Sequence, residues 1–138
     1  MNVKSEEQVV GLLRAADLRP TRQRVALGVV LFGQGDRHVT AEDLHVEAER
    51  AGERVSLATV YNTLHQFRRA GLLRELAIDG SKTYFDTNTS NHSHFFIEED
   101  GQLVDIPDHA IHIDGLPQPP AGMQISHVDI VVRLSRKR

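Results

Sequence analysis

Apolar residues recur at the spacing of an α-helix through the first part of the chain. The pattern predicts three helices, over residues 5–16, 20–32 and 40–52. Ser5 stands at the start of the first, the Pro20-Thr21 pair opens the second, and Thr40 with Asp43 has the T-x-x-D spacing of a capping box. The second helix is apolar nearly all round, which is expected of a helix buried at the centre of a small bundle.

A fourth helix, predicted for residues 56–69, has one apolar face, while Thr, Tyr, Asn, Gln and Arg side chains occupy the others. Two strand-like runs follow, residues 72–78 and 82–86, around an Asp79-Gly80 pair typical of a hairpin turn. Three helices, a polar-faced fourth and a hairpin, in this order, predict a winged helix-turn-helix domain over residues 1–86.

The hydrophobic period changes after a polar stretch at residues 87–91, which we interpret as a hinge. Strand-like runs follow at residues 94–98, 102–106 and 125–134. Three prolines within residues 115–122 restrict that stretch to a turn or a very short helix. We expect residues 92–138 to form a small α/β dimerisation domain that senses metal or haem, and the whole chain to be of the α+β class.

The composition is that of an ordinary globular protein, with 40% hydrophobic and 25% charged residues among 138. No apolar run approaches the roughly 18 residues of a membrane-spanning helix, and the start of the chain is polar, so we expect a cytoplasmic protein with no membrane partner. A second domain this small would need a partner subunit to complete its packing, which predicts a homodimer.

The net charge of −3 is unevenly distributed along the chain. Residues 1–84 hold 12 Lys or Arg against 11 Asp or Glu, whereas residues 85–138 hold 4 against 8, so the two parts carry +1 and −4. This balance argues against DNA binding by bulk charge and favours a local basic face that a dimer uses twice. The alternative is a mildly acidic protein with no nucleic-acid partner.

The fourth helix has the residues of a helix that reads base edges in the major groove of double-stranded DNA. Ser56 would cap it. The side chains expected to approach bases are those of Ala58, Thr59, Tyr61 and Asn62, and those expected to hold phosphates are those of Arg22, Arg24 and Lys82. The alternative is that Tyr61 packs in the core and the arginines are only solvated.

The chain has eight histidines and no cysteine, so any metal must be held by nitrogen and oxygen. His92 and His94 are two residues apart, so on a strand both rings project from the same face. Candidate partners are His38 in the loop before the third helix, Asp86 at the end of the hairpin and Asp105 on the neighbouring strand. Such a set suits Fe²⁺ or Mn²⁺ and could hold Zn²⁺ in vitro.

Two alternatives remain open for the histidines. His92 and His94 considered alone could be exposed strand residues. A second metal or haem site could be formed by His109, His112 and His127, unless these three lie on the surface.

Taken together, the motifs resemble those of the ferric uptake regulator family, whose members are dimeric winged-helix repressors. The resemblance runs from about Leu12 to Leu134. It rests on RPTRQR at residues 19–24, HVTAEDL at 38–44, SLATVY at 56–61, GL at 71–72, YFD at 84–86 and HSH at 92–94. The resemblance implies that the helix holding Ala58 to Tyr61 reads DNA. It also implies a regulatory metal site at His38, Asp86, His92, His94 and Asp105, with spacing similar to that of peroxide-sensing members.

The chain departs from most of the family at its cysteines. Ile97 and Asp100 stand where the first C-x-x-C pair of a structural zinc site would lie, so no Cys-bound zinc is expected and apolar strand pairing must hold the dimer. The missing cysteines, the clipped segment at residues 116–123 and the His-x-His pair most resemble the iron response regulator subgroup. That subgroup is tied to haem status, which makes His92 and His94 candidate haem ligands.

We therefore expect a metal-dependent repressor that responds to iron or haem and controls genes of iron and haem metabolism. Peroxide sensing by Fe²⁺ is the alternative within the family. A metal-dependent hydrolase would need a spare acid or base beyond the five predicted ligands, and the sequence offers none that converges there, so we expect no enzyme.

Overall fold

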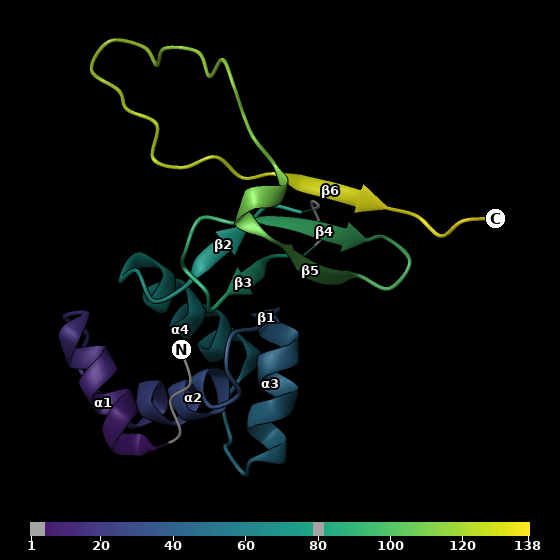
Figure 1. Ribbon diagram of the computed structural model, residues 1–138. Coiled ribbons are helices and arrows are strands. Elements are labelled where there is room, and N and C mark those ends of the chain that lie inside the picture. The colour runs from purple at the N-terminus through teal and green to yellow at the C-terminus, as the bar shows by residue number, and fades with distance from the viewer. Residues whose placement is uncertain (1–4, 79–81) are drawn as a thin grey trace. The chain divides into compact units, whose positions relative to one another are not determined.

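The computed structural model describes residues 5–78 and 82–138 (Figure 1). The chain divides into two compact units, one ending at Thr89 and the other beginning at Ser90. The division falls inside the stretch interpreted as a hinge from its sequence. Helices and small sheets occur along the chain, so the α+β class is confirmed.

In the described part of the first unit, four helices begin where their start signals predict them. They are α1 (Glu6–Ala15), α2 (Arg22–Phe32), α3 (Ala41–Arg50) and α4 (Leu57–Arg69). Each begins after a hydroxyl-bearing N-cap whose oxygen accepts a backbone N–H of the first turn; the caps are Ser5, Thr21, Thr40 and Ser56. At Ser5 and Thr40 the bond is reciprocated by the side chain three residues on, which completes two capping boxes.

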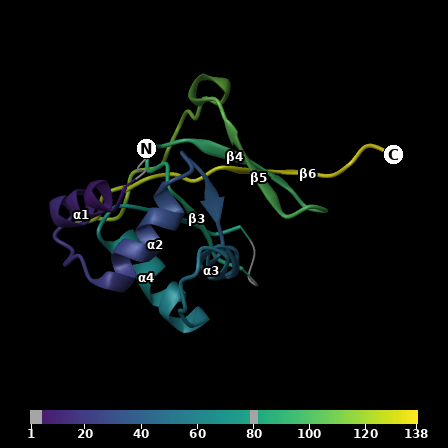
Figure 2. The ribbon, with the colours of Figure 1, turned by 90° about the horizontal axis from the view of Figure 1, so that it is seen from below.

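The core of the first unit lies around α2, which contacts α1, α3 and α4. Leu27, Leu31 and Phe32 of α2 are almost fully buried. α1 and α2 lie side by side in both views (Figure 1 and Figure 2), and Gly28 is the point of close approach. A Cβ at Gly28 would lie 2.6 Å from Cγ1 of Val9, so only glycine allows α1 this close.

The hairpin predicted after α4 is part of a three-stranded sheet with the order β1-β3-β2. Its strands are β1 (His38–Val39), β2 (Arg74–Leu76) and β3 (Tyr84–Asp86). The predicted turn at Asp79-Gly80 lies outside the described residues. The placement of His38 in a loop was wrong, because His38 pairs with Asp86 across the antiparallel β1–β3 ladder. Two residues are too few to produce a strand period, so β1 depends on β3 being beside it.

The second unit is built on a sheet with the order β5-β4-β6. Its strands are β4 (Ser93–Ile97), β5 (Gln102–Ile106) and β6 (Val131–Leu134). β4 pairs antiparallel with β5 and parallel with β6. The strand predicted for residues 125–134 was too long, because ladder pairing with β4 begins only at Val131. A 3₁₀ turn at Asp108–Ala110 was not predicted.

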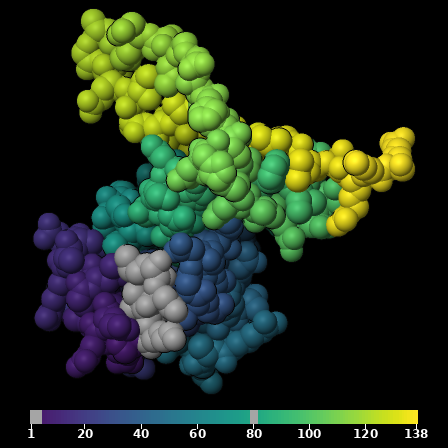
Figure 3. Space-filling model, viewed as in Figure 1, coloured from purple at the N-terminus to yellow at the C-terminus, as the bar shows by residue number. Residues whose placement is uncertain are grey.

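A long loop, residues 111–130, joins the 3₁₀ turn to β6 and stands out from its sheet (Figure 1 and Figure 3). It contains the three prolines that were predicted to prevent a long helix, and it is irregular throughout. Several of its apolar side chains are well exposed, namely those of Ile113, Leu116, Met123, Ile125 and Val128. Among the residues that the structure describes, no helix combines the length and apolar character needed to cross a membrane.

Candidate metal centre and nucleic-acid surface

The first unit brings His38 and Asp86 together at the β1–β3 ladder. The distance from His38 Nε2 to Asp86 Oδ2 is 3.2 Å, and the Asp86 side chain is 1% exposed. The backbone N–H of Asn88 donates to the other carboxylate oxygen, Oδ1, over 2.9 Å. This bond fixes the orientation of the carboxylate and directs Oδ2 toward the imidazole.

The second unit brings His92, His94 and Asp105 together. His94 and Asp105 are register partners across the β4–β5 ladder, and His92 directly precedes β4 on the same face as His94. Asp105 Oδ1 lies 3.2 Å from His92 Nε2 and 3.4 Å from His94 Nε2. The two rings are 4.4 Å apart between centroids, and the imidazole side chains are 4% and 3% exposed.

The His92 ring is oriented by the backbone, because its Nδ1 lies 2.7 Å from the carbonyl oxygen of Ser90. A carbonyl can only accept, so the neutral ring carries its proton on Nδ1 and turns the Nε2 lone pair toward Asp105. Two hydrogen-bond acceptors, both of them electron-pair donors, then face each other at 3.2 Å unless a proton or a metal ion lies between them. An Nδ1–H bonded to a backbone carbonyl is the usual support of a metal-ligating imidazole.

The donor chemistry of these residues fits a divalent metal ion. Within each unit the ligand atoms lie within 4.8 Å of one another. The two sets together offer imidazole nitrogen and carboxylate oxygen and no sulfur, which suits Fe²⁺, Mn²⁺ or Zn²⁺. All five residues that the sequence nominated as ligands therefore belong to one of the two sets.

The structure does not gather His109, His112 and His127 into a ligand set. Over the described ranges, no group of three or more potential ligands includes any of them. His109 lies in the 3₁₀ turn and His112 is exposed in the loop after it, while His127 pairs with Asp129 at 3.2 Å. A second metal or haem site at these residues stays a prediction.

The N-terminal part of α4 presents a small polar surface. Ser56 Oγ accepts the N–H of Thr59 over 3.1 Å and donates to the Thr59 hydroxyl over 3.0 Å. Ala58 and Asn62 are exposed and Thr59 is half-buried, while Val60 and Leu64 are buried on the opposite face. Small and hydrogen-bonding groups therefore cover the outer face, as base reading requires.

Two residues nominated for DNA contact are engaged within the protein. The Tyr61 hydroxyl donates to the Thr83 hydroxyl over 3.0 Å, and its ring lies 5.0 Å from that of His65. Arg24 Nε donates to Gln66 Oε1 over 3.0 Å, and Arg24 Nη1 donates to the carbonyl of Arg19 over 2.9 Å. The bonds from Tyr61 to Thr83 and from Arg24 to Gln66 join residues far apart in the sequence, so no local pattern could have indicated these two.

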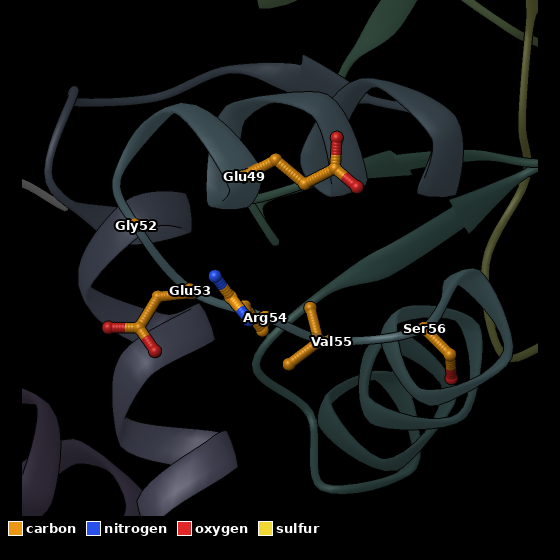
Figure 4. Close-up of a pocket in the computed structure, with 6 residues that line it drawn as sticks. All are labelled: Glu49, Gly52, Glu53, Arg54, Val55 and Ser56. Atoms are coloured by element: carbon orange, nitrogen blue, oxygen red, sulfur yellow. The ribbon is translucent and has the colours of Figure 1, made fainter.

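The loop before α4 borders a hollow of about 690 Å³ lined by residues Glu49, Gly52, Glu53, Arg54, Val55 and Ser56 (Figure 4). A second hollow of about 390 Å³ shares residues 52–55 of this loop and is bounded on its other side by Arg22 and Gln23. Arg22 and Lys82, both nominated for phosphate contact, are exposed. Arg54 was not nominated, because nothing in the local sequence distinguishes it from a solvated arginine.

Comparisons with known proteins agree on one family. The profile of the ferric uptake regulator family matches residues 15–133. The peroxide-responsive repressor PerR of Staphylococcus aureus is 32% identical over 122 residues, which cover 88% of this chain and 82% of that protein. The solved ferric uptake regulator from Pseudomonas aeruginosa with manganese has a TM-score of 0.71 at 26% identity and covers 94% of this chain and 98% of its own. The PerR structure from Streptococcus pyogenes has a TM-score of 0.50 at 28% identity, and the match covers 76% of this chain and 71% of the Streptococcus pyogenes chain.

Proposed function

Because the chain belongs to the ferric uptake regulator family, we propose that it is a homodimeric repressor that binds operator DNA when its histidine and carboxylate site holds a divalent metal ion. Members of this family are metal-binding transcription regulators, not enzymes, and they bind DNA as dimers. For this chain we propose in addition that the ion held at this site controls operator binding.

The observation that carries the proposal is the pair of prepared ligand sets. His38 and Asp86 come from the first unit, and His92, His94 and Asp105 come from the second. We infer that both sets ligate the same ion. A shared ion would supply the positive charge that draws the two carboxylates and three imidazoles together, so residues 1–86 would be held at one angle to residues 92–138 across the hinge at 87–91.

Thermodynamic linkage provides the test of this regulatory mechanism. If the metal-bound angle is the one that fits DNA, then DNA must raise metal affinity by the same factor by which metal raises DNA affinity. We suggest selecting a duplex from a random pool with the Mn²⁺-loaded protein and titrating Mn²⁺ with and without it. Equal Mn²⁺ affinity in the two titrations would contradict the mechanism. A His94→Ala variant should bind the selected duplex with the same affinity at every Mn²⁺ concentration.

Peroxide sensing is a second candidate function, supported by the identity to the repressor PerR of Staphylococcus aureus. In this proposal Fe²⁺ would be the resident ion, and hydrogen peroxide would transfer one oxygen atom to the ring of a ligating histidine, His38 or His92, and leave as water, so that the ligand is lost. Mass spectrometry should then find one added oxygen on either residue after peroxide treatment of the Fe²⁺ form. The Mn²⁺ form is the matched control and should remain unmodified.

The response to iron or haem, and membership of the iron response regulator subgroup, depend on the sequence resemblance alone. The near-complete burial of the His92 and His94 rings favours a small ion over a planar macrocycle at these residues. A haem titration followed by absorption spectroscopy, with His92→Ala and His94→Ala as controls, separates the two. Identical spectra for the wild type and both variants would exclude haem ligation by His92 and His94.

A further inference from the structure

We infer that Arg22 and Arg54 together hold the phosphate backbone of bound DNA at the start of α4. The inference rests on the proposed DNA binding and deepens it, because it adds Arg54 and assigns the phosphate contact to one place on the surface. The two arginines come from α2 and from the loop before α4, and they line the same hollow of about 390 Å³.

The first argument is the availability of the two guanidinium groups. Arg22 and Arg54 are exposed, and neither forms a hydrogen bond or an ion pair with the described part of the chain. By contrast, Arg37 pairs with Glu47 at 2.6 Å, and Arg68 pairs with Glu75 at 3.2 Å. Both guanidinium groups are therefore available to an anion at this hollow.

The second argument is the charge of the hollow. Its lining contains Arg22, Arg54 and a single acidic residue, Glu53, so it is net positive in a chain of net charge −3. Figure 4 shows the Glu53 carboxylate and the Arg54 guanidinium extending from the loop in different directions.

The third argument is position. Arg54 precedes the N-cap of α4 by two residues, and α4 is the helix whose outer face carries Ala58, Thr59 and Asn62. A helix that enters the major groove has the phosphate backbone passing beside it, and arginines there set register without reading sequence. The ligand that fits the hollow is thus a backbone phosphate rather than a base.

The salt dependence of DNA binding tests this inference directly, because each lost phosphate contact lowers the slope of log K against log salt by about 0.9. We expect Arg22→Ala and Arg54→Ala each to lower the slope by about that amount, and the double variant by about twice as much. Arg54→Lys keeps the charge and should retain most of the slope. Arg69→Ala is the matched control, since Arg69 is an exposed arginine at the opposite end of α4.

The outcomes separate the inference from the proposed function. If the Mn²⁺-loaded wild type selects no duplex, the proposed function fails. If the wild type binds but Arg22→Ala and Arg54→Ala keep its slope, as Arg69→Ala should, only the phosphate assignment is overturned. Circular dichroism of each variant verifies that a changed slope is measured on folded protein.

Discussion

His94 faces Asp105 across the β4–β5 ladder, with His94 Nε2 3.4 Å from Asp105 Oδ1. The same oxygen lies 3.2 Å from Nε2 of His92, so one carboxylate serves two imidazoles. The Asp105 side chain is 44% exposed while the two imidazole rings are nearly buried, so the carboxylate is the solvent-facing member of this ligand set.

Removing the charge of Asp105 should weaken metal binding. We expect Asp105→Asn to lower Mn²⁺ affinity by about 10- to 100-fold or more, because losses of this size are typical even for groups that only support a ligand. Isothermal titration with Mn²⁺ measures the change. Asp114→Asn, an exposed carboxylate in the long loop, is the control and should leave the affinity unaltered. Equal affinities of Asp105→Asn and the wild type would exclude Asp105 as a ligand.

Two histidines should occupy opposite neutral tautomers in the metal-free protein. His92 Nδ1 contacts the carbonyl of Ser90 at 2.7 Å, whereas His45 Nε2 contacts the carbonyl of Val55 at 2.9 Å. We therefore expect the proton on Nδ1 in His92 and on Nε2 in His45. Long-range proton–nitrogen NMR distinguishes the two forms. Adding Zn²⁺ should then shift the Nε2 signal of His92 and leave His45 unchanged, and a His92 proton found on Nε2 would disprove its predicted role.

The link between Arg24 and Gln66 should position α4 rather than contact DNA. We expect Arg24→Ala to weaken binding of the selected duplex by up to about tenfold, the equivalent of a hydrogen bond worth 0.5–1.5 kcal/mol, with no change in salt slope. Gln66→Ala should have a similar effect. The double variant should lose less DNA-binding free energy than the sum of the losses of the two single variants. If Arg24 contacted a phosphate, as predicted from the sequence, Arg24→Ala would instead lower the salt slope.

The close approach of α1 to α2 should make the first unit intolerant of a side chain at Gly28. A Cβ there would meet the buried and stiff Val9 side chain, so we expect Gly28→Ala to lower the free energy of unfolding by about 1–3 kcal/mol. Gly11→Ala is the control, because nothing lies within 4 Å of a Cβ on that helical residue. It should raise stability by up to about 1 kcal/mol. Chemical denaturation measures both, and equal stabilities would contradict the tight packing.

The sequence predicted those parts of the fold that local chemistry determines. Helix starts were found because a cap such as Ser56 and the groups it binds lie within one turn of each other. β1 and the true start of β6 were missed because both depend on a partner strand distant in the chain. The same distinction holds at the surface of α4. The polar face of the helix was visible in its period, whereas the bonds of Arg24 and Tyr61 depend on residues that only folding brings near.

The structure brings the five predicted ligands into two sets, which goes further than their local signal would suggest. A period of two places His92 and His94 on one face, and Asp105 follows from pairing of adjacent strands. His38 was nominated by its residue type and by the family resemblance, because nothing nearby in the sequence reveals that Asp86 is its ladder partner.

The parallel pairing of β4 with β6 has a consequence for the order of assembly. His94 is the register partner of Val131, and the intervening chain contains β5, the 3₁₀ turn and the whole long loop. Closing so large a loop is entropically costly, so such contacts form after local ones. A nascent or C-terminally clipped chain would thus possess its helical half before the strand bearing His94 gained its second neighbour. We expect such a chain to fold its first unit, which ends at Thr89, and not to respond to metal.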